Sequence, residues 1–284
     1  MTQKIAIAIL HGMGTPKEDF ADDIIKRISK RFSRKLSCEN AENELVFESV
    51  FWSSIFESKQ LELWKKMQES AQLDFPRLRR FIIEFLGDAI AYQPTMFGNQ
   101  NYDKVHAYVA SAINRLRKKV GSDAPLCVIS HSLGTIVASN YFYDLQFKRK
   151  NRGAETRRRM NQTPIEQGET LTLFYTLGSP MVLWSLRYTD FGIPIIIPSP
   201  RVSEFYPNVV GEWLNFYDKD DIFAYPLKGM NEAYNLAVTK DIAVNAGGIF
   251  TSWSPLSHRD YDKDNEVIDP IVNGLVRTWR SING

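Results

Sequence analysis

Two short, uninterrupted apolar runs constrain the fold of this chain more than any other feature. Residues 5–10 (IAIAIL) and 126–130 (LCVIS) are each followed directly by a turn that contains glycine. Hydrophobicity that is continuous rather than alternating is typical of strands covered on both faces, as in parallel sheets. Residues 18–36 then carry apolar side chains at helical spacing, and we expect a second helix over 135–147. This order predicts an α/β fold with a mostly parallel central sheet and helices on both faces.

The rest of the chain continues the alternation of strands and helices. A length of 284 residues suits one α/β domain, so we expect a single domain over 1–284. Proline punctuates the apolar stretch 191–207, which we expect to be a loop. Further strands are expected at 45–52, 170–177, 213–217 and, with a weaker pattern, 242–244, and further helices at 102–120 and 266–280.

Residues 57–92 form a helical stretch longer than a crossover between strands needs. One apolar stripe includes Leu78, Ile82 and Leu86, and Pro76 interrupts the pattern. Two interpretations stay open, namely a helical insertion that caps a pocket and additional packing against the sheet edge.

Composition excludes several classes of protein. A net charge of only +2 does not indicate the strongly basic surface that binds nucleic acid, so we expect no nucleic-acid partner. The two cysteines suggest neither a disulfide framework nor a metal site, and no organic cofactor is expected. The apolar run at 5–10 lacks the length of a signal peptide, and no segment is long and apolar enough to span a membrane, so we expect a cytoplasmic protein.

The basic segment 148–159 is interpreted as a solvated or disordered surface loop, with an anion-binding patch as the alternative.

The turn after the second apolar run contains the strongest chemical motif, Ser130-His131-Ser132-Leu133-Gly134. A serine hydroxyl is a weak nucleophile, and a hydrolase exposes it on a sharp turn between a strand and a helix. Small residues two before and two after that serine let the turn pass its neighbours, which explains the pattern Gly-x-Ser-x-Gly. Serine occupies the first of these positions here. The competing interpretation is that Ser132 simply caps the following helix.

The turn after the first apolar run reads His11-Gly12-Met13-Gly14. A glycine turn between a strand and a helix can also cradle a phosphate, but the third glycine and the Lys-Ser/Thr pair of such loops are missing.

Together these motifs resemble those of the α/β-hydrolase superfamily, and some stretches are similar to its lipases and esterases. The resemblance covers residues 5–260, except for the insertions at 57–92 and 148–168. It implies an α/β-hydrolase fold with Ser132 as nucleophile and an oxyanion hole formed by the backbone amides of Met13 and Leu133. Leu177-Gly178-Ser179-Pro180 resembles a supporting, non-catalytic turn of the same family.

In this family the acid and then the base follow the serine along the chain. Three aspartates, Asp218, Asp220 and Asp221, follow the strand at 213–217. The sequence Asp-Ile resembles the acid segment of many lipases and favours Asp221, with Asp220 and Asp218 as alternatives that we expect to face solvent or form the turn. Only His258 follows both the serine and the acid, which makes it the expected base, and a chance surface histidine is the alternative.

These residues predict a serine hydrolase that cleaves a carboxylic ester, thioester or lipid by a Ser132-His258-Asp221 triad through an acyl-enzyme. Such a triad needs no metal. Two alternatives of another class remain. One is a catalytically silent α/β-hydrolase fold used for binding or regulation, and the other is a module that recruits RNA or anionic membrane through its basic segment. The sequence leaves the oligomeric state open.

Overall fold

The strands of the central sheet all run parallel, in the order β2-β1-β3-β4-β5-β6. The computed structural model describes residues 2–13, 17–37, 41–93, 100–147, 152–246 and 260–284. The strands are β1 (Ile5–Leu10), β2 (Leu45–Val50), β3 (Leu126–His131), β4 (Leu171–Leu177), β5 (Glu212–Asp218) and β6 (Lys240–Val244). The α/β fold predicted from the apolar runs is confirmed.

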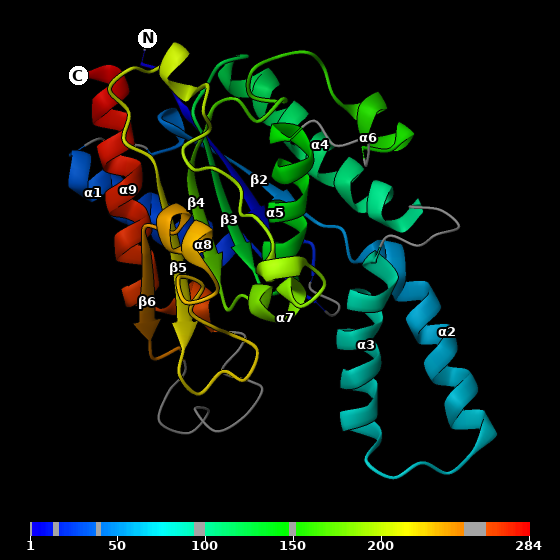
Figure 1. Ribbon diagram of the computed structural model, residues 1–284. Helices are drawn as coiled ribbons and strands as arrows, with labels where there is room; N and C mark the ends of the chain where they lie inside the picture. Colours follow the sequence, from blue (N-terminus) through cyan, green and yellow to red (C-terminus); the bar gives the residue numbers. More distant parts are fainter. Residues whose placement is uncertain (1, 14–16, 38–40, 94–99, 148–151, 247–259) are drawn as a thin grey trace.

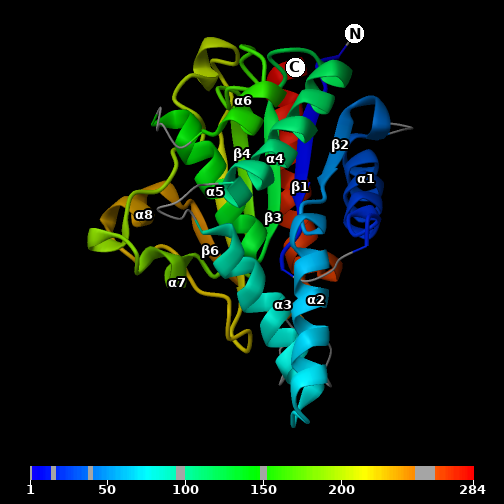
Figure 2. The same cartoon turned by 90° about the vertical axis from the view of Figure 1, so that its right-hand side faces the viewer.

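Helices cover both faces of this sheet. The longer helices of the described chain are α1 (Asp22–Leu36), α2 (Ser54–Ser70), α3 (Pro76–Tyr92), α4 (Gln100–Val120), α5 (Leu133–Gln146) and α9 (Asn265–Asn283), and the shorter helices are α6 (Ala154–Arg159), α7 (Met181–Ser185) and α8 (Glu232–Ala237). In Figures 1 and 2, α1 and α9 lie on one face, and α4 and α5 lie on the other.

The first strand shows why the fold needs an uninterrupted apolar run. Ile5, Ile7 and Ile9 pack in the core layer under α1 and α9, whereas Ala6 and Ala8 pack in the layer under α4 and α5. Successive side chains of a strand point to opposite faces, so a strand between two helical layers must be apolar at every position. All residues of β1 are buried.

The chain order places two strand ends side by side at the centre of the sheet. The chain starts at β1, moves outward to β2 and crosses back to β3 on the other side of β1. Leu10 at the end of β1 is in register with Ser130 near the end of β3. Open α/β sheets bind ligands at the carboxyl ends of their strands where the strand order reverses, and the turns of the two sequence motifs meet there.

The helical stretch expected at 57–92 is a hairpin of α2 and α3 that projects away from the sheet (Figures 1 and 2). Inside the hairpin, the side-chain amide of Gln60 donates to Asp88 at 2.6 Å. Part of the predicted apolar stripe faces outward, because Leu78, Ile82 and Leu86 are 45% to 54% exposed.

The basic segment 148–159 departs from the surface loop that we expected, because its last part forms the short helix α6. The carboxylate of Asp103 on α4 accepts hydrogen bonds from the backbone amides of Glu155 and Thr156, both at 2.9 Å. A cap supplied from another helix stabilises a short helix that has little intrinsic tendency to form. Residues 148–151 of the segment lie outside the described part of the chain.

No helix in the described ranges combines the length and the apolar character that crossing a bilayer would require.

Candidate functional site

Ser132 occupies a strained turn between β3 and α5. Its backbone has φ 52° and ψ −128°, a conformation that a residue with a side chain rarely adopts. Two neighbours hold the turn, since the amide of Ser132 donates to the carbonyl of Leu177 at 2.9 Å and Thr135 donates through both its amide and its hydroxyl to the carbonyl of Ser132. Strain of this kind persists only where surrounding contacts impose it, and it gathers at functional sites.

The alternative interpretation, in which Ser132 caps the helix, requires its side chain to accept a hydrogen bond from the first turn of α5. The side chain makes no such bond. Ser132 therefore occupies the N-cap position of α5 without capping the helix through its side chain.

The small residues of the motif have separate structural reasons. A Cβ atom on Gly134 would lie 2.3 Å from the carbonyl oxygen of His11, so only glycine lets α5 approach the end of β1. Ser130, which replaces the first glycine of the pattern, is fully buried, and its hydroxyl donates to the carbonyl of Tyr175 at 3.2 Å. The irregular residue is thus accommodated without an unsatisfied polar atom.

The glycine turn after β1 lies directly against the serine. A Cβ atom on Gly12 would lie 2.5 Å from Cβ of Ser132 and 3.2 Å from its Oγ. The peptide that joins Gly12 to Met13 is therefore beside the hydroxyl. Gly14 lies outside the described residues.

His11 fixes the orientation of this peptide. Its Nε2 accepts hydrogen bonds from the backbone amides of Trp52 at 3.1 Å and Ser53 at 3.4 Å, so the proton of a neutral imidazole must be on Nδ1. Nδ1 lies 2.6 Å from the carbonyl oxygen of Gly12 and donates to it. Burial lowers the pKa of His11 to about 4, which keeps the ring neutral at pH 7. The ring also stacks on the indole of Trp52, with centroids 4.8 Å apart.

Leu133 begins α5, and the first amides of a helix have no acceptor within the helix. They carry the positive end of the helix dipole. The sequence motif thus places the Leu133 amide immediately after the serine, while the Met13 amide belongs to the peptide beside it.

The three candidate acids lie at the end of β5 and directly after it, and they differ in burial. Asp220 is exposed, whereas Asp218 and Asp221 are 2% and 5% exposed. Asp218 forms the turn as expected, because its Oδ1 accepts from the amide of Asp220 at 2.9 Å, but it is buried and does not face solvent. Its Oδ2 is buried and has no hydrogen-bond partner among the described residues.

Tyr261 connects the acid segment to the turn that carries the serine, a role that the sequence did not reveal. Its hydroxyl donates to Oδ2 of Asp221 at 2.9 Å and accepts from the backbone amide of Asp218 at 2.8 Å. Burial and the charge of Asp221 raise the pKa of this hydroxyl, so it remains a donor. Its ring lies 5.9 Å from the ring of His131, next to the serine.

His258, the predicted base, lies outside the described residues. It precedes Tyr261 by three positions in the sequence.

The Gly178-Ser179 turn after β4 has a supporting position. The hydroxyl of Ser179 is 2.8 Å from the hydroxyl of Thr135 on α5, and it accepts from the amide of Met181 at 3.3 Å. Ser179 is fully buried and joins the turn after β4 to the helix that follows Ser132.

Two hollows adjoin the turns. One has a volume of about 310 Å³ and is lined by residues that include Gly12, Ser130, His131 and Tyr261. The other, also about 310 Å³, is a groove that runs from Met13 and Pro180 between α3 and α7, where Leu86, Ile90 and Leu183 line it. The lining of this groove is almost entirely apolar, so it suits a hydrocarbon chain.

Comparisons with known proteins are sparse. No protein-family model matches the chain, and no curated protein does. Among solved structures the chain is similar to one described with LipS and LipT, two metagenome-derived lipolytic enzymes. The identity is 11%, the match covers 86% of this chain and 84% of that chain, and the TM-score is 0.35.

Proposed function

We propose that the protein is a serine hydrolase that cleaves a carboxylic ester or thioester through an acyl-enzyme on Ser132. The observation that carries this proposal is the strained backbone of Ser132 at the start of α5, with the Gly12 backbone pressed against its side chain. A structural serine has no need of this conformation, whereas a nucleophile must stand clear of its strand and close to an oxyanion site.

In this mechanism Oγ of Ser132 attacks the carbonyl carbon and His258 takes its proton. The backbone amides of Met13 and Leu133 stabilise the oxyanion. The tetrahedral intermediate then expels the alcohol or thiol, which receives the proton from His258, and water releases the acid by the same steps in reverse. His258 is three positions before Tyr261 in the sequence, and a chain segment of that length spans at most about 11 Å. The sequence spacing therefore allows a base at this position to approach the carboxylate that Tyr261 contacts.

We propose Asp221 as the acid that orients His258. Its burial and the hydrogen bonds that it accepts from Tyr261 and from the amide of Phe223 at 3.0 Å support this role because they hold the carboxylate in one place. Asp218 is the second candidate, because its Oδ2 is buried and has no hydrogen-bond partner within the described part of the chain.

The groove between α3 and α7 is proposed to hold the acyl chain, because it begins at Met13, whose amide is one of the proposed oxyanion donors. The ester carbonyl would then lie at the end of the groove nearest Ser132.

Hydrolysis of p-nitrophenyl esters by matched serine variants tests the proposal. Ser132→Ala is expected to lower kcat by about 10⁴-fold or more, whereas Ser130→Ala, two residues away, retains most activity. Asp221→Asn is expected to lower kcat by about 10³- to 10⁴-fold, and Asp220→Asn to leave it unchanged. If Asp218→Asn alone gave the large loss, the acid would be Asp218. Absence of turnover in the wild-type protein would favour the catalytically silent alternative.

A further inference from the structure

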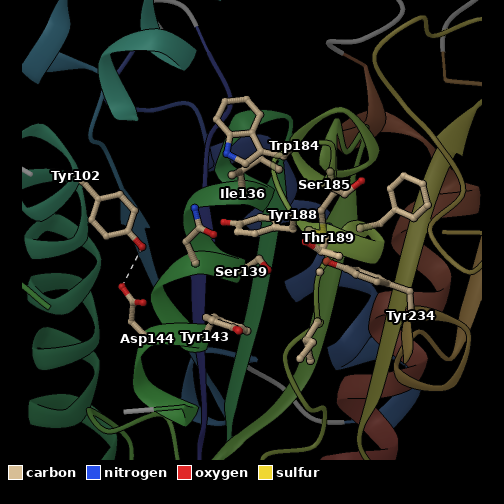
Figure 3. A pocket seen from close by; sticks show the side chains of 15 residues that line it. Tyr102, Ile136, Ser139, Tyr143, Asp144, Trp184, Ser185, Tyr188, Thr189 and Tyr234 are labelled. Carbon is tan, nitrogen blue, oxygen red and sulfur yellow. Dashed lines mark hydrogen bonds between the residues drawn. The ribbon is translucent and has the colours of Figure 1, made fainter. Parts of the chain in front are cut away.

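A second cavity, separate from the proposed nucleophile, lies along the outer face of α5. It has a volume of about 330 Å³ and extends from Ile136, one helical turn beyond Ser132, to Asp144. Residues from α4, α7, α8 and the segment 188–193 complete its wall. In Figure 3, Tyr102 and Asp144 stand at one side of it, Tyr234 at the opposite side and Trp184 at one end.

Aromatic rings and one carboxylate dominate the lining. The rings belong to Tyr102, Tyr143, Trp184, Tyr188, Phe191 and Tyr234. The carboxylate is that of Asp144, and among the described residues that line the cavity none is lysine, arginine or histidine. The faces of aromatic rings carry partial negative charge and attract cations. The described part of the cavity wall therefore combines two features that favour a positive ligand, and it contains no basic side chain.

The carboxylate of Asp144 contacts side chains of the neighbouring helix α4. The carboxylate is 2% exposed and accepts a hydrogen bond from the hydroxyl of Tyr102 at 2.9 Å. Nδ1 of His106 is 3.9 Å from it, but burial lowers the pKa of His106 to about 3, so this ring is neutral at pH 7. Burial raises the pKa of Tyr102, and the charge of Asp144 raises it further.

We propose that this cavity is a binding site for an organic ammonium ion. The ammonium group lies among the rings beside Asp144. Cation–π contacts contribute about 0.5–2 kcal/mol each and are the usual means by which proteins bind alkylated ammonium groups.

Calorimetric titration of Ser132→Ala protein tests the site without interference from turnover, so its result does not depend on the proposed hydrolase activity. The probes are choline, ethanolamine and 3,3-dimethylbutan-1-ol, which has the shape of choline without its charge. At least one cation is expected to bind about tenfold more tightly than the uncharged alcohol. The better of the two cations shows whether the site takes a quaternary or a primary ammonium. Equal binding of the uncharged alcohol, or no saturable binding of either cation, would overturn the proposal.

Two variants locate the binding. Tyr188→Ala removes a ring that is 50% exposed, and Asp144→Asn removes the charge while an amide oxygen can still accept from Tyr102. Each is expected to weaken binding of the preferred cation about tenfold. The matched control is Tyr108→Ala, a ring on α4 that is 43% exposed and does not line the cavity. If Asp144→Asn fails to fold, Tyr188→Ala decides alone. Wild-type affinity in the folded variants would place any bound cation elsewhere and overturn the assignment.

Discussion

Nδ1 of His11 lies 2.6 Å from the carbonyl oxygen of Gly12, and this contact sets the direction of the peptide that joins Gly12 to Met13. The carbonyl and the N–H of one trans peptide point in opposite directions. A proton donor that holds the Gly12 carbonyl therefore also holds the Met13 N–H. Because Trp52 and Ser53 donate to the other ring nitrogen, the imidazole presents its proton to Gly12 and to no other group.

His11→Ala is expected to release this peptide. If Met13 supplies an oxyanion donor, kcat falls by about 10²-fold or more while KM changes little, because the lost interaction belongs to the transition state. Steady-state kinetics together with thermal unfolding separate this effect from a general loss of structure. A folded variant with wild-type kcat would exclude the Met13 amide as a donor positioned by His11.

Two buried neutral histidines make stability depend on pH. The pKa values of His11 and His106 are lowered from 6.5 to about 4 and about 3, because burial disfavours the charged ring. Below pH 6.5 the unfolded chain binds protons that the folded protein does not, so the free energy of unfolding falls as pH decreases toward 4.

The slope reaches about 2.7 kcal/mol per pH unit for two histidines and about 1.4 for one. His106→Gln is therefore expected to reduce the dependence of unfolding free energy on pH by about one proton between pH 6 and 4.5. Urea denaturation at a series of pH values measures this dependence of the unfolding free energy on pH. An unchanged slope would show that His106 is charged in the folded protein.

Gly134→Ala tests the close approach of α5 to β1. The new methyl group would lie 2.3 Å from the carbonyl oxygen of His11, and neither backbone can yield easily. We expect a loss of about 1–3 kcal/mol in the free energy of unfolding. Gly229→Ala is the matched control, since no atom lies within 4 Å of a Cβ built there. Similar stabilities of the two variants would contradict this packing.

Polar substitutions in the groove test its proposed role in binding the acyl chain. Leu86→Ser combined with Ile90→Ser alters two side chains that are 48% and 70% exposed, so the fold should tolerate them. We expect kcat/KM for an octanoyl ester to fall about tenfold while an acetyl ester is hardly affected, since each buried methylene contributes about 0.8 kcal/mol. Leu236→Ser is the matched control, because this side chain on α8 is 78% exposed and does not line the groove. An equal loss for both esters would show that the groove does not bind the acyl chain.

Local patterns in the sequence predicted the elements that depend on local chemistry. The run at Ile5–Leu10 is a strand with the predicted bounds, and Ser132 lies between a strand and a helix as its motif requires. Such positions are predictable because burial on both faces and a tight turn restrict the residues that fit.

Contacts between distant segments could not be predicted in this way. Helix α6 depends on Asp103, which lies 52 and 53 positions before the amides that it caps. Tyr261 reaches Asp221 across 40 positions, and no pattern around either residue indicates the pair. The burial of Asp218 likewise depends on how the loop after β5 packs against the chain near Tyr261. Tertiary contacts decide these features, and one sequence does not contain their signature.

Covalent labelling with a fluorophosphonate tests the central claim most directly, because the probe reacts with an activated serine hydroxyl and spares an ordinary one. Digestion of the labelled protein and mass spectrometry identify the modified residue. We predict a single adduct on Ser132, which disappears in Ser132→Ala and persists in Ser130→Ala. A folded wild-type protein that remains unlabelled, or one that carries the adduct on another serine, would contradict the assignment of Ser132 as nucleophile.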